Sequence, residues 1–454
     1  MFLSLEPAMT RLTRPLTGLG SPSAISRRRF LAASSAALGA PMFVRARNAN
    51  EKLNIAVIGV ADRGEANLNG VKHENIAVLC DVDGDRLDQA KSKFPNAVGF
   101  TDYRKFFDKL DKQIDAVVVS TPDHSHCLPA SLAMTAGKPV YCEKPLAYSV
   151  NEVRFLRKLA IEKKLVTQMG TQIHAENNYR RATEIVQSGL LGPVNRVHVW
   201  LNGKPPASKK LGVKPSAKFD IDLWLGPAKD DFFEAEATNP TKQWPHYHWR
   251  FWWEFGGGML ADFGCHYMDL PFWALNLTSP TSVAAIGKKT YEGDNTVPDV
   301  MQVDYKFPAV GTRPAVHLTW YHGVSGPSLD GKTTYPGFAS GVLFEGAKGK
   351  LLADYGKLKL MPDAFAKDFT APPKSIPASI GHHKEWTEAV KSGGSTTCNF
   401  AYSGLLAEAV LLGNVAYRCG QEIAWDAGKG VTNVAAAEQY LGRDYRKGWE
   451  LPKG

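Results

Sequence analysis

The tripeptide Glu143-Lys144-Pro145 places an acid, an amine and an imino acid directly after a short apolar run, Val140 to Cys142. Such a run is typical of a buried strand, and open α/β sheets carry their chemistry at the carboxyl ends of strands. Pro145 removes a backbone donor and fixes the turn, for which a cis peptide bond is one solution. A lysine held there can act as a proton donor. The alternative is an ordinary surface turn with a solvated lysine.

A second group of reactive side chains follows three consecutive glycines, residues 256–258. We expect a helix that begins near Met259, on which Asp262 and His266 are four residues apart and share one face. Histidine titrates near neutrality and can accept a hydroxyl proton, while a carboxylate beside it stabilises its charged form. A plain helical ion pair is the alternative interpretation.

An aromatic stretch, residues 244–253, precedes this helix, and eight of its ten residues are aromatic or histidine. Aromatic faces beside hydrogen-bonding groups suit sugar rings, so we expect Trp249, Arg250 and Trp253 to contact a substrate. A packed core or a dimer surface is the alternative, because aromatic side chains bury the most area. A metal site from Asp262, His266, His246 and His248 is conceivable, but we predict no metal.

A glycine-rich turn follows the strand predicted at Leu53–Ile58 and opens a helical stretch. Gly59 and Gly64 are the outer glycines of a G-x-G-x-x-G pattern, and Ala61 replaces the middle one. Such a turn lets the backbone approach a pyrophosphate at the N-terminus of the helix. An ordinary strand-turn-helix is the alternative, and Ala61 weakens the match.

Asp81 ends the second predicted strand, 22 residues after Gly59. A carboxylate at this position binds a ribose hydroxyl and favours NAD over NADP. Arg86 lies close enough in the chain to leave NADP open. The turn and Asp81 together predict a dinucleotide-binding site.

Strands alternate with helices from Leu53 to about Thr171, which predicts a parallel, right-handed doubly wound sheet. The second half predicts a large, mostly antiparallel sheet with one open face, and this face suggests a homo-oligomer. The expected strands there are 196–201, 282–289, 299–307, 315–321 and 340–345, and the expected helices are 382–391 and 402–419. We read most of the six cysteines as small core residues.

Residues 1–50 hold seven arginines and one acid, Glu6. Without them the chain has 47 basic and 44 acidic residues, a net charge of +3 instead of +9. A nearly balanced surface does not imply a nucleic-acid partner.

The segment Ser26-Arg27-Arg28-Arg29-Phe30-Leu31 precedes a mildly apolar run that extends to Val44. This pattern predicts an export signal of the twin-arginine type, cleaved between about residues 44 and 50, and a periplasmic protein. The run is too short for a permanent bilayer anchor, so we expect no stable membrane attachment. We therefore divide the chain into residues 1–50, 51–171 and 172–454.

Glu143-Lys144-Pro145 after a strand, with Asp262-x-x-x-His266 in the second half, resembles the Gfo/Idh/MocA oxidoreductases. The resemblance extends over residues 53–450 and includes the stretches 120–126 (Ser-Thr-Pro-Asp-His-Ser-His) and 445–449 (Tyr-Arg-Lys-Gly-Trp). It implies an α/β Rossmann dinucleotide-binding domain and an α+β domain whose large, mostly antiparallel sheet is open on one face.

The resemblance also implies roles for single residues. Lys144 would contact the reacting hydroxyl, His266 would be the general base, and Asp262 would be its partner and a substrate contact. The cofactor would be lined by Gly59, Gly64, Asp81, Ser120, Thr121, His124, Glu143, Lys144 and, near the nicotinamide, Gln172.

The implied reaction is hydride transfer between a sugar, polyol or glycoside carbon and a nicotinamide cofactor. Because free NAD is scarce outside the cytoplasm, export predicts a tightly held cofactor that is recycled within a turnover. One alternative is an NAD-dependent, redox-assisted glycoside hydrolase, which Lys144 disfavours because the related N-acetylgalactosaminidases lack that lysine. The other is a non-catalytic sugar- and cofactor-binding protein, against which the presence of Lys144, Asp262 and His266 argues.

Overall fold

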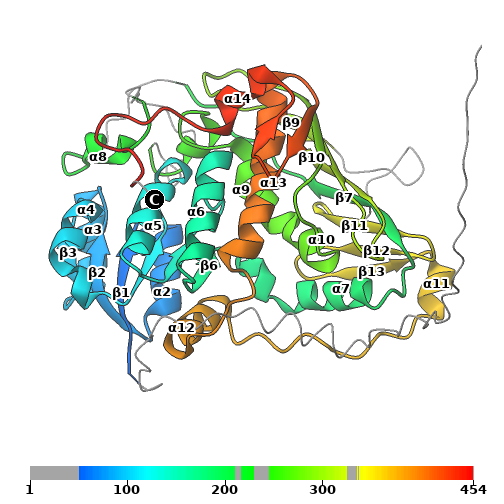
Figure 1. Ribbon diagram of the computed structural model, residues 1–454, viewed down its shortest axis with the longest axis horizontal. Coiled ribbons are helices and arrows are strands. Elements are labelled where there is room, and N and C mark those ends of the chain that lie inside the picture. The colour runs from blue at the N-terminus through cyan, green and yellow to red at the C-terminus, as the bar shows by residue number, and fades with distance from the viewer. Residues whose placement is uncertain (1–50, 210–215, 230–244, 325–334, 336, 453–454) are drawn as a thin grey trace, which may run out of the picture. The chain divides into compact units, whose positions relative to one another are not determined.

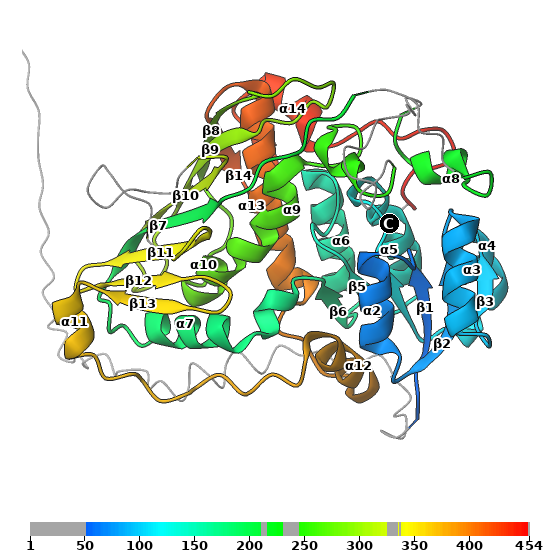
Figure 2. The ribbon, with the colours of Figure 1, turned by 180° about the vertical axis from the view of Figure 1, so that it is seen from behind.

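The computed structural model describes residues 51–209, 216–229, 245–324, 335 and 337–452, and two sheets dominate them (Figures 1 and 2). The predicted export signal and Trp244 lie outside the described residues, as do parts of three loops.

Short apolar runs form a six-stranded, all-parallel sheet in the order β3-β2-β1-β4-β5-β6. The strands are β1 (Asn54–Ile58), β2 (Asn75–Cys80), β3 (Val98–Phe100), β4 (Ala116–Val119), β5 (Val140–Cys142) and β6 (Thr167–Met169). The strand order reverses between β1 and β4, and ligands of such sheets bind outside the carboxyl ends at this point. The doubly wound sheet predicted from the sequence is therefore confirmed.

The alternation of side chains along β1 assigns its two faces to two different cores. Ile55 and Val57 pack with residues of α2, α3 and α12, whereas Ala56 and Ile58 pack with residues of α4, α5 and α6. These helices are α2 (Arg63–Val71), α3 (Gly84–Lys93), α4 (Tyr103–Leu110), α5 (Cys127–Thr135), α6 (Val150–Glu162) and α12 (His382–Ser392). Because α12 comes from the second half of the chain, its fully buried Trp386 ties the two halves together.

A nine-stranded sheet forms the second half, in the order β13-β12-β11-β7-β10-β9-β8-β14-β15. Its strands are β7 (Val194–Leu201), β8 (Ser282–Lys288), β9 (Val300–Phe307), β10 (Val316–His322), β11 (Gly341–Gly346), β12 (Lys350–Ala353), β13 (Leu358–Met361), β14 (Ile423–Asp426) and β15 (Val431–Thr432). The β7–β10 pair is parallel, and the other pairs are antiparallel. The five predicted strands exist, and β12 to β15 were not predicted.

Helices of the second half lie against one face of this sheet (Figures 1 and 2). They are α7 (Asn177–Gln187), α9 (Gly258–Tyr267), α10 (Asp269–Ala274) and α13 (Phe400–Cys419). The helices α11 (Asp363–Lys367) and α14 (Ala435–Leu441) contact the edge strands β13 and β15, whereas α8 (Ile221–Leu225) lies apart from this sheet. Gly264 lets α9 approach α13 closely, because a Cβ there would lie 3.0 Å from both γ-carbons of Val410. This contact fixes the position of α9, the helix that carries Asp262 and His266, against α13.

Among the described residues, α13 is the one helix long and apolar enough to cross a membrane. However, 78% of its apolar window is buried inside the protein, where it packs against α6 and α9. All six cysteines are free, and five of them are buried, which agrees with their interpretation as core residues.

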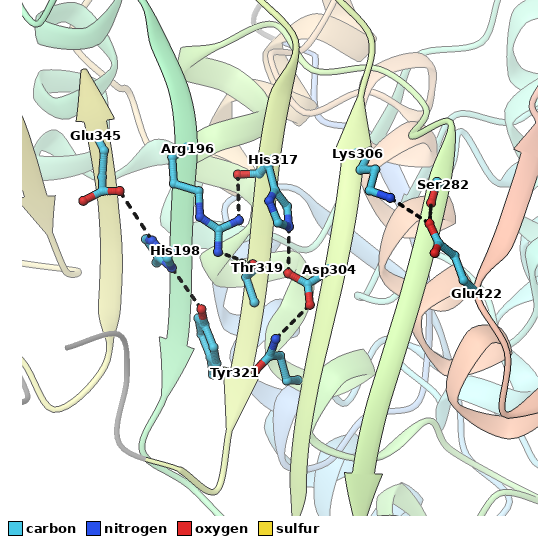
Figure 3. A network of polar contacts seen from close by, with 11 residues as sticks. Arg196, His198, Ser282, Asp304, Lys306, His317, Thr319, Tyr321, Glu345 and Glu422 are labelled. Carbon is cyan, nitrogen blue, oxygen red and sulfur yellow. Dashed lines mark hydrogen bonds and ion pairs between the residues drawn. The ribbon is translucent and has the colours of Figure 1, made fainter. Parts of the chain in front are cut away.

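The other face of the nine-stranded sheet carries a polar network across β11, β7, β10 and β9 (Figure 3). Arg196 donates to the Thr319 hydroxyl at 2.7 Å, and that hydroxyl donates to Asp304 at 2.5 Å. His317 lies 2.7 Å from the same carboxylate. At one end of this face Tyr335 and Phe338 pack against Trp200, Leu343 and Leu352, which are buried. Described helices leave the part that carries the polar network uncovered, as expected from the alternating strands.

Candidate active site

A pocket of about 310 Å³ opens at the carboxyl ends of the six-stranded sheet. Its walls come from the loops after β1, β2, β4 and β5 on one side and from α8, residues 246–250 and α9 on the other. The point at which the strand order of the first sheet reverses, between β1 and β4, therefore faces helix α9 across the pocket.

The turn after β1 is shaped by close backbone approach. Gly59 has φ +81°, and a Cβ there would lie 2.7 Å from the Ser120 carbonyl oxygen. A Cβ at Gly64 would lie 2.1 Å from the Gly59 carbonyl oxygen, so α2 could not begin here with a larger residue. Gly59 and Ala61 line the pocket, whereas Gly64 supports the turn from behind. This cradle fits a pyrophosphate at the start of α2.

Asp81 lines the pocket just after β2, and its carboxylate accepts the Val60 and Asp83 amides at 3.0 Å each. Burial raises the pKa of Asp81, while these two amides oppose the shift. Arg86 also lines the pocket, but its guanidinium lies 2.8 Å from the carboxylate of Asp62 and 3.6 Å from that of Asp83. Because two acids already neutralise Arg86, the arrangement suits a ribose hydroxyl better than a 2′-phosphate.

Lys144 reaches from the end of β5 to helix α9. Its Nζ donates to the Asp262 carboxylate at 2.5 Å and to the Asp262 carbonyl at 2.6 Å, and the Lys144–Pro145 peptide bond is cis. Arg250 approaches the same carboxylate at 3.5 Å. Burial alone would raise the pKa of Asp262, but the charges of Lys144 and Arg250 outweigh it and hold the pKa well below its usual range. Asp262 is thus a carboxylate held between two cations.

His266 lines the same pocket one helix turn after Asp262. Burial and the charge of Lys144 lower its pKa to about 3, against the opposing effect of Asp262. At neutral pH the ring is therefore uncharged, and its buried Nδ1 lacks a hydrogen-bond partner in the described part of the chain.

Glu143 is a buried residue of the pocket wall and is held by amide groups from two elements. Its carboxylate accepts from the Asn67 amide at 2.9 Å and from the Gln172 amide at 2.7 Å. Asn67 also donates to the Ser120 hydroxyl at 2.9 Å. Ser120, Thr121 and Glu143 line the pocket, but Gln172 does not, so Gln172 acts on the site through Glu143.

His124 does not line the pocket either. Its Nε2 lies 2.8 Å from the Trp224 carbonyl, and its ring is fully buried, which lowers its pKa to about 3. His124 therefore supports α8. The predicted direct contact of His124 with the cofactor is corrected, because its side chain does not reach the pocket.

The aromatic stretch divides between the pocket and the core. Trp249 and Arg250 line the pocket, and the Arg250 guanidinium lies 4.4 Å from the Trp249 ring centroid. Trp253 points elsewhere: the Arg418 guanidinium lies 5.1 Å from its ring, and it lines a smaller, separate pocket. The predicted substrate contact at Trp253 is therefore corrected, because this side chain faces α13.

The four residues considered for a metal do not gather. His246 lies 3.2 Å from the Asp83 carboxylate, on the far side of the pocket from α9. In the described part of the chain, only His174, Asp269 and Cys398 come close enough together to share an ion. His174 already lies 2.9 Å from the Asp269 carboxylate, to which Tyr402 donates at 2.7 Å.

Asp123 is a pocket residue to which the sequence analysis assigned no role. Its side chain is buried, with 5% of the residue exposed, near the charges of Lys144, Asp262 and Arg250. Burial raises the pKa of Asp123 to about 8, and Lys144 and Arg250 only partly oppose this shift. An aspartate after a proline resembles an ordinary helix cap, so only the folded chain reveals this carboxyl.

His246 of the aromatic stretch lines the pocket, together with Phe219, Leu223 and Trp224. The last three residues are not predicted in the site, because they follow no motif or period that would single them out.

The two halves of the chain match two models of the same protein family. Residues 53–171 match its "NAD-binding Rossmann fold", and residues 180–451 match its "C-terminal alpha/beta domain". The chain belongs to the Gfo/Idh/MocA oxidoreductase family. The first sheet with its glycine turn and Asp81 is the NAD-binding domain of this family member.

Two inositol 2-dehydrogenases are similar in sequence to this family member. The one from Salmonella paratyphi B is 27% identical over 152 residues, which are 32% of this chain and 45% of the relative. The one from Rhodococcus erythropolis is 31% identical over 202 residues, 42% of this chain and 57% of the relative. The chain thus spans about half the length of the curated relatives it matches.

Two solved structures share the fold of this Gfo/Idh/MocA protein. The WlbA dehydrogenase from Bordetella pertussis, in complex with NADH and UDP-GlcNAcA, has a TM-score of 0.60 and 16% identity, covering 83% of this chain and 99% of that one. Levoglucosan dehydrogenase, in complex with NADH and L-sorbose, has a TM-score of 0.55 and 16% identity, covering 85% and 100%.

We predict that Asp123 makes stability fall as pH rises. The folded protein keeps the Asp123 proton up to about pH 8, whereas the unfolded chain loses it near the ordinary aspartate pKa of 3.8. The stabilisation is therefore complete below about pH 4 and lost as the pH rises to about 8. Between these pH values the free energy of unfolding of the wild type should fall by about 2–5 kcal/mol relative to that of Asp123→Asn. Chemical unfolding at a series of pH values measures both.

Asp363→Asn, at an exposed aspartate, is the matched control and should follow the wild type. If the free energies of unfolding of the wild type and Asp123→Asn change in parallel with pH, Asp123 is ionised in the folded protein over this whole range, and the prediction is wrong.

Proposed function

We propose that this protein is an NAD-dependent oxidoreductase that moves a hydride between a CH–OH carbon of a sugar, polyol or glycoside and a tightly bound nicotinamide. The observation that carries this proposal is the meeting of Lys144, Asp262 and His266 in the pocket that also holds the nucleotide cradle. Names of similar proteins support it, since inositol 2-dehydrogenase, levoglucosan dehydrogenase and the WlbA complex with NADH all concern polyols or sugars.

The cradle at Gly59, the carboxylate of Asp81 and the pocket-facing Ser120 and Thr121 are the residues that would hold NAD. When bound, NAD supplies the hydride acceptor. Glycines at 59 and 64 let the turn pack directly against its own backbone and that of residues 120–121, where a Cβ would collide. Such a tight turn before the N-terminus of α2 is the local structure expected for binding a pyrophosphate.

His266 is proposed as the base that takes the hydroxyl proton while the hydride leaves the same carbon. Its low pKa keeps it uncharged at pH 7, so it is in the form that can accept a proton. The carboxylate of Asp262 faces the charge that His266 acquires and lowers its cost. Lys144, oriented by Asp262, is placed to donate to the substrate oxygen. Trp249 and Arg250 offer an aromatic face and a donor to a sugar ring.

Replacement of Lys144 tests the assignment. We expect Lys144→Met to lower the single-turnover rate of nicotinamide reduction by about 10²–10⁴-fold, because the oriented donor is gone, while sugar affinity changes little. Reduction is followed by absorbance and sugar affinity by calorimetry. Lys158→Met, at a side chain that is 73% exposed on α6, is the control and should keep full activity.

Activity that survives in Lys144→Met would remove Lys144 from the mechanism. Product analysis in the same assay separates the redox-assisted hydrolase from the dehydrogenase, because the hydrolase releases a free sugar and leaves the cofactor oxidised.

We further propose that residues 1–50 direct the protein to the periplasm by the twin-arginine route. The support is the arginine pair before an apolar run that is rich in alanine and serine. Arg27→Lys together with Arg28→Lys should leave the protein in the cytoplasm on cell fractionation, whereas Arg45→Lys together with Arg47→Lys should not. Export that continues without the pair would contradict the proposal.

We also propose self-association through the open face of the nine-stranded sheet. Support comes from the extent of this face and from Ile286, which is 70% exposed beside the polar network. Ile286→Arg should reduce the molar mass measured by light scattering, because a buried charge opposes the contact. Ile161→Arg, at a residue 52% exposed on α6, should leave it unchanged. A monomeric wild type would overturn this proposal.

A further inference from the structure

The pocket has two ends, which the strand order distinguishes. Lys144 follows β5, whereas Asp81 follows β2, and β3 is the next strand outward from β2. Val82, Arg86, Thr101 and Tyr103 line the pocket on this outer side. Since the carboxylate after β2 meets a ribose hydroxyl in such folds, the outer end is where the adenosine half of a dinucleotide belongs.

A segment of the second half, residues 216–225, is bound to this outer end by its backbone. The Gly84 amide donates to the Lys218 carbonyl at 3.0 Å, and the Asp220 amide donates to the Val82 carbonyl at 2.9 Å. Phe219 thereby forms an antiparallel bridge with Asp83. The segment adds a short strand-like edge beside the loop after β2, which is a common way for one segment to bind another.

Apolar side chains of this segment line the pocket, and its polar side chains lie in solvent. Phe219 and Trp224 are 8% and 5% exposed and line the pocket with Leu223, whereas Lys218 is exposed. His246 completes this wall, in edge contact with the Phe219 ring at 5.7 Å. Aromatic and aliphatic faces of this kind stack on a nucleobase.

Contacts behind the segment hold it in place. The Trp224 carbonyl lies 2.8 Å from Nε2 of the buried His124, and Arg446 donates to the Gly226 carbonyl at 2.9 Å. Lys218 lies 3.3 Å from Asp85 and 3.0 Å from Asp88, although these exposed pairs contribute little. The wall is therefore fixed from the nucleotide-binding domain and from the C-terminal segment together.

We propose that residues 216–225 form a cap over the adenosine half of bound NAD and keep the nucleotide on the protein between turnovers. The proposal rests on the proposed function, since it requires NAD in the pocket. It assigns Phe219, Leu223, Trp224 and His246 to the adenosine site, which the nucleotide fingerprint alone does not include. Release then requires the cap to separate from residues 82–84, so exchange with free nucleotide is slow.

The first experiment is to unfold the purified full chain and identify the nucleotide that it releases, then to measure release from the native protein. Protein loaded with NADH is mixed with excess NAD, and loss of nicotinamide fluorescence gives the release rate. Phe219→Ala should release NADH about tenfold faster than the wild type, and Ile221→Ala, on the outer side of the same segment, within about twofold of it.

A crosslink tests the cap without weakening the fold. An ideal Cβ at Gly84 would lie 3.0 Å from the Lys218 Cβ, so a small outward shift reaches the roughly 3.5–4.5 Å of a disulfide. In the variant Gly84→Cys with Lys218→Cys, the oxidised form should release NADH at least about tenfold more slowly than the reduced form. The two single-cysteine variants should show no such dependence on reductant.

The outcomes separate this proposal from the proposed function. Equal release rates of the oxidised and reduced forms, with NADH bound and sugar-dependent reduction intact, would overturn the cap alone. Failure of the protein to hold or bind any nicotinamide nucleotide would overturn both. A wild type that releases NADH as fast as Phe219→Ala would likewise overturn the cap.

Discussion

The ion pair between Lys144 and Asp262 is the contact on which the candidate site depends, because it joins the end of β5 to helix α9 at 2.5 Å. Both side chains are largely withdrawn from solvent, and charges in such a place must be paired. The pair therefore fixes how the pocket-facing side of α9 meets the nucleotide-binding sheet. His266 and Arg250 lie around it, and the positive charges of Lys144 and Arg250 keep Asp262 ionised.

The surrounding elements hold this ion pair in place. Gly264 sets α9 against α13, and α12 with its buried Trp386 returns to cover the first sheet. Behind β5, Glu143 is held by amides of Asn67 and Gln172. The reactive side chains thus stand on rigid elements whose own packing is apolar, which is the arrangement that precise positioning of a substrate requires.

Much of this could be predicted from the sequence, because the signals are local. The alternation of apolar runs with helical stretches fixed the parallel sheet, and the glycine turn, Asp81, Lys144, Asp262 and His266 all reach one pocket as expected. What could not be predicted depends on long-range packing. Trp253 packs against Arg418 of α13, which a stretch without periodicity does not predict. Asp123 lies near the charges of Lys144 and Asp262, which are far from it in the chain. The short strands β12 to β15 gain their stability from neighbours rather than from their own pattern.

The contact of Arg443 with the His124 carbonyl joins residues 319 positions apart in the chain. During synthesis the nucleotide-binding sheet leaves the ribosome long before this arginine and its neighbours, which buttress α8 through Arg446. The pocket wall can therefore be completed only after nearly all of the described chain has been made. A growing chain would offer an incomplete site to a nucleotide. Nucleotide binding is therefore a late event in folding and comes just before any later processing of the folded protein.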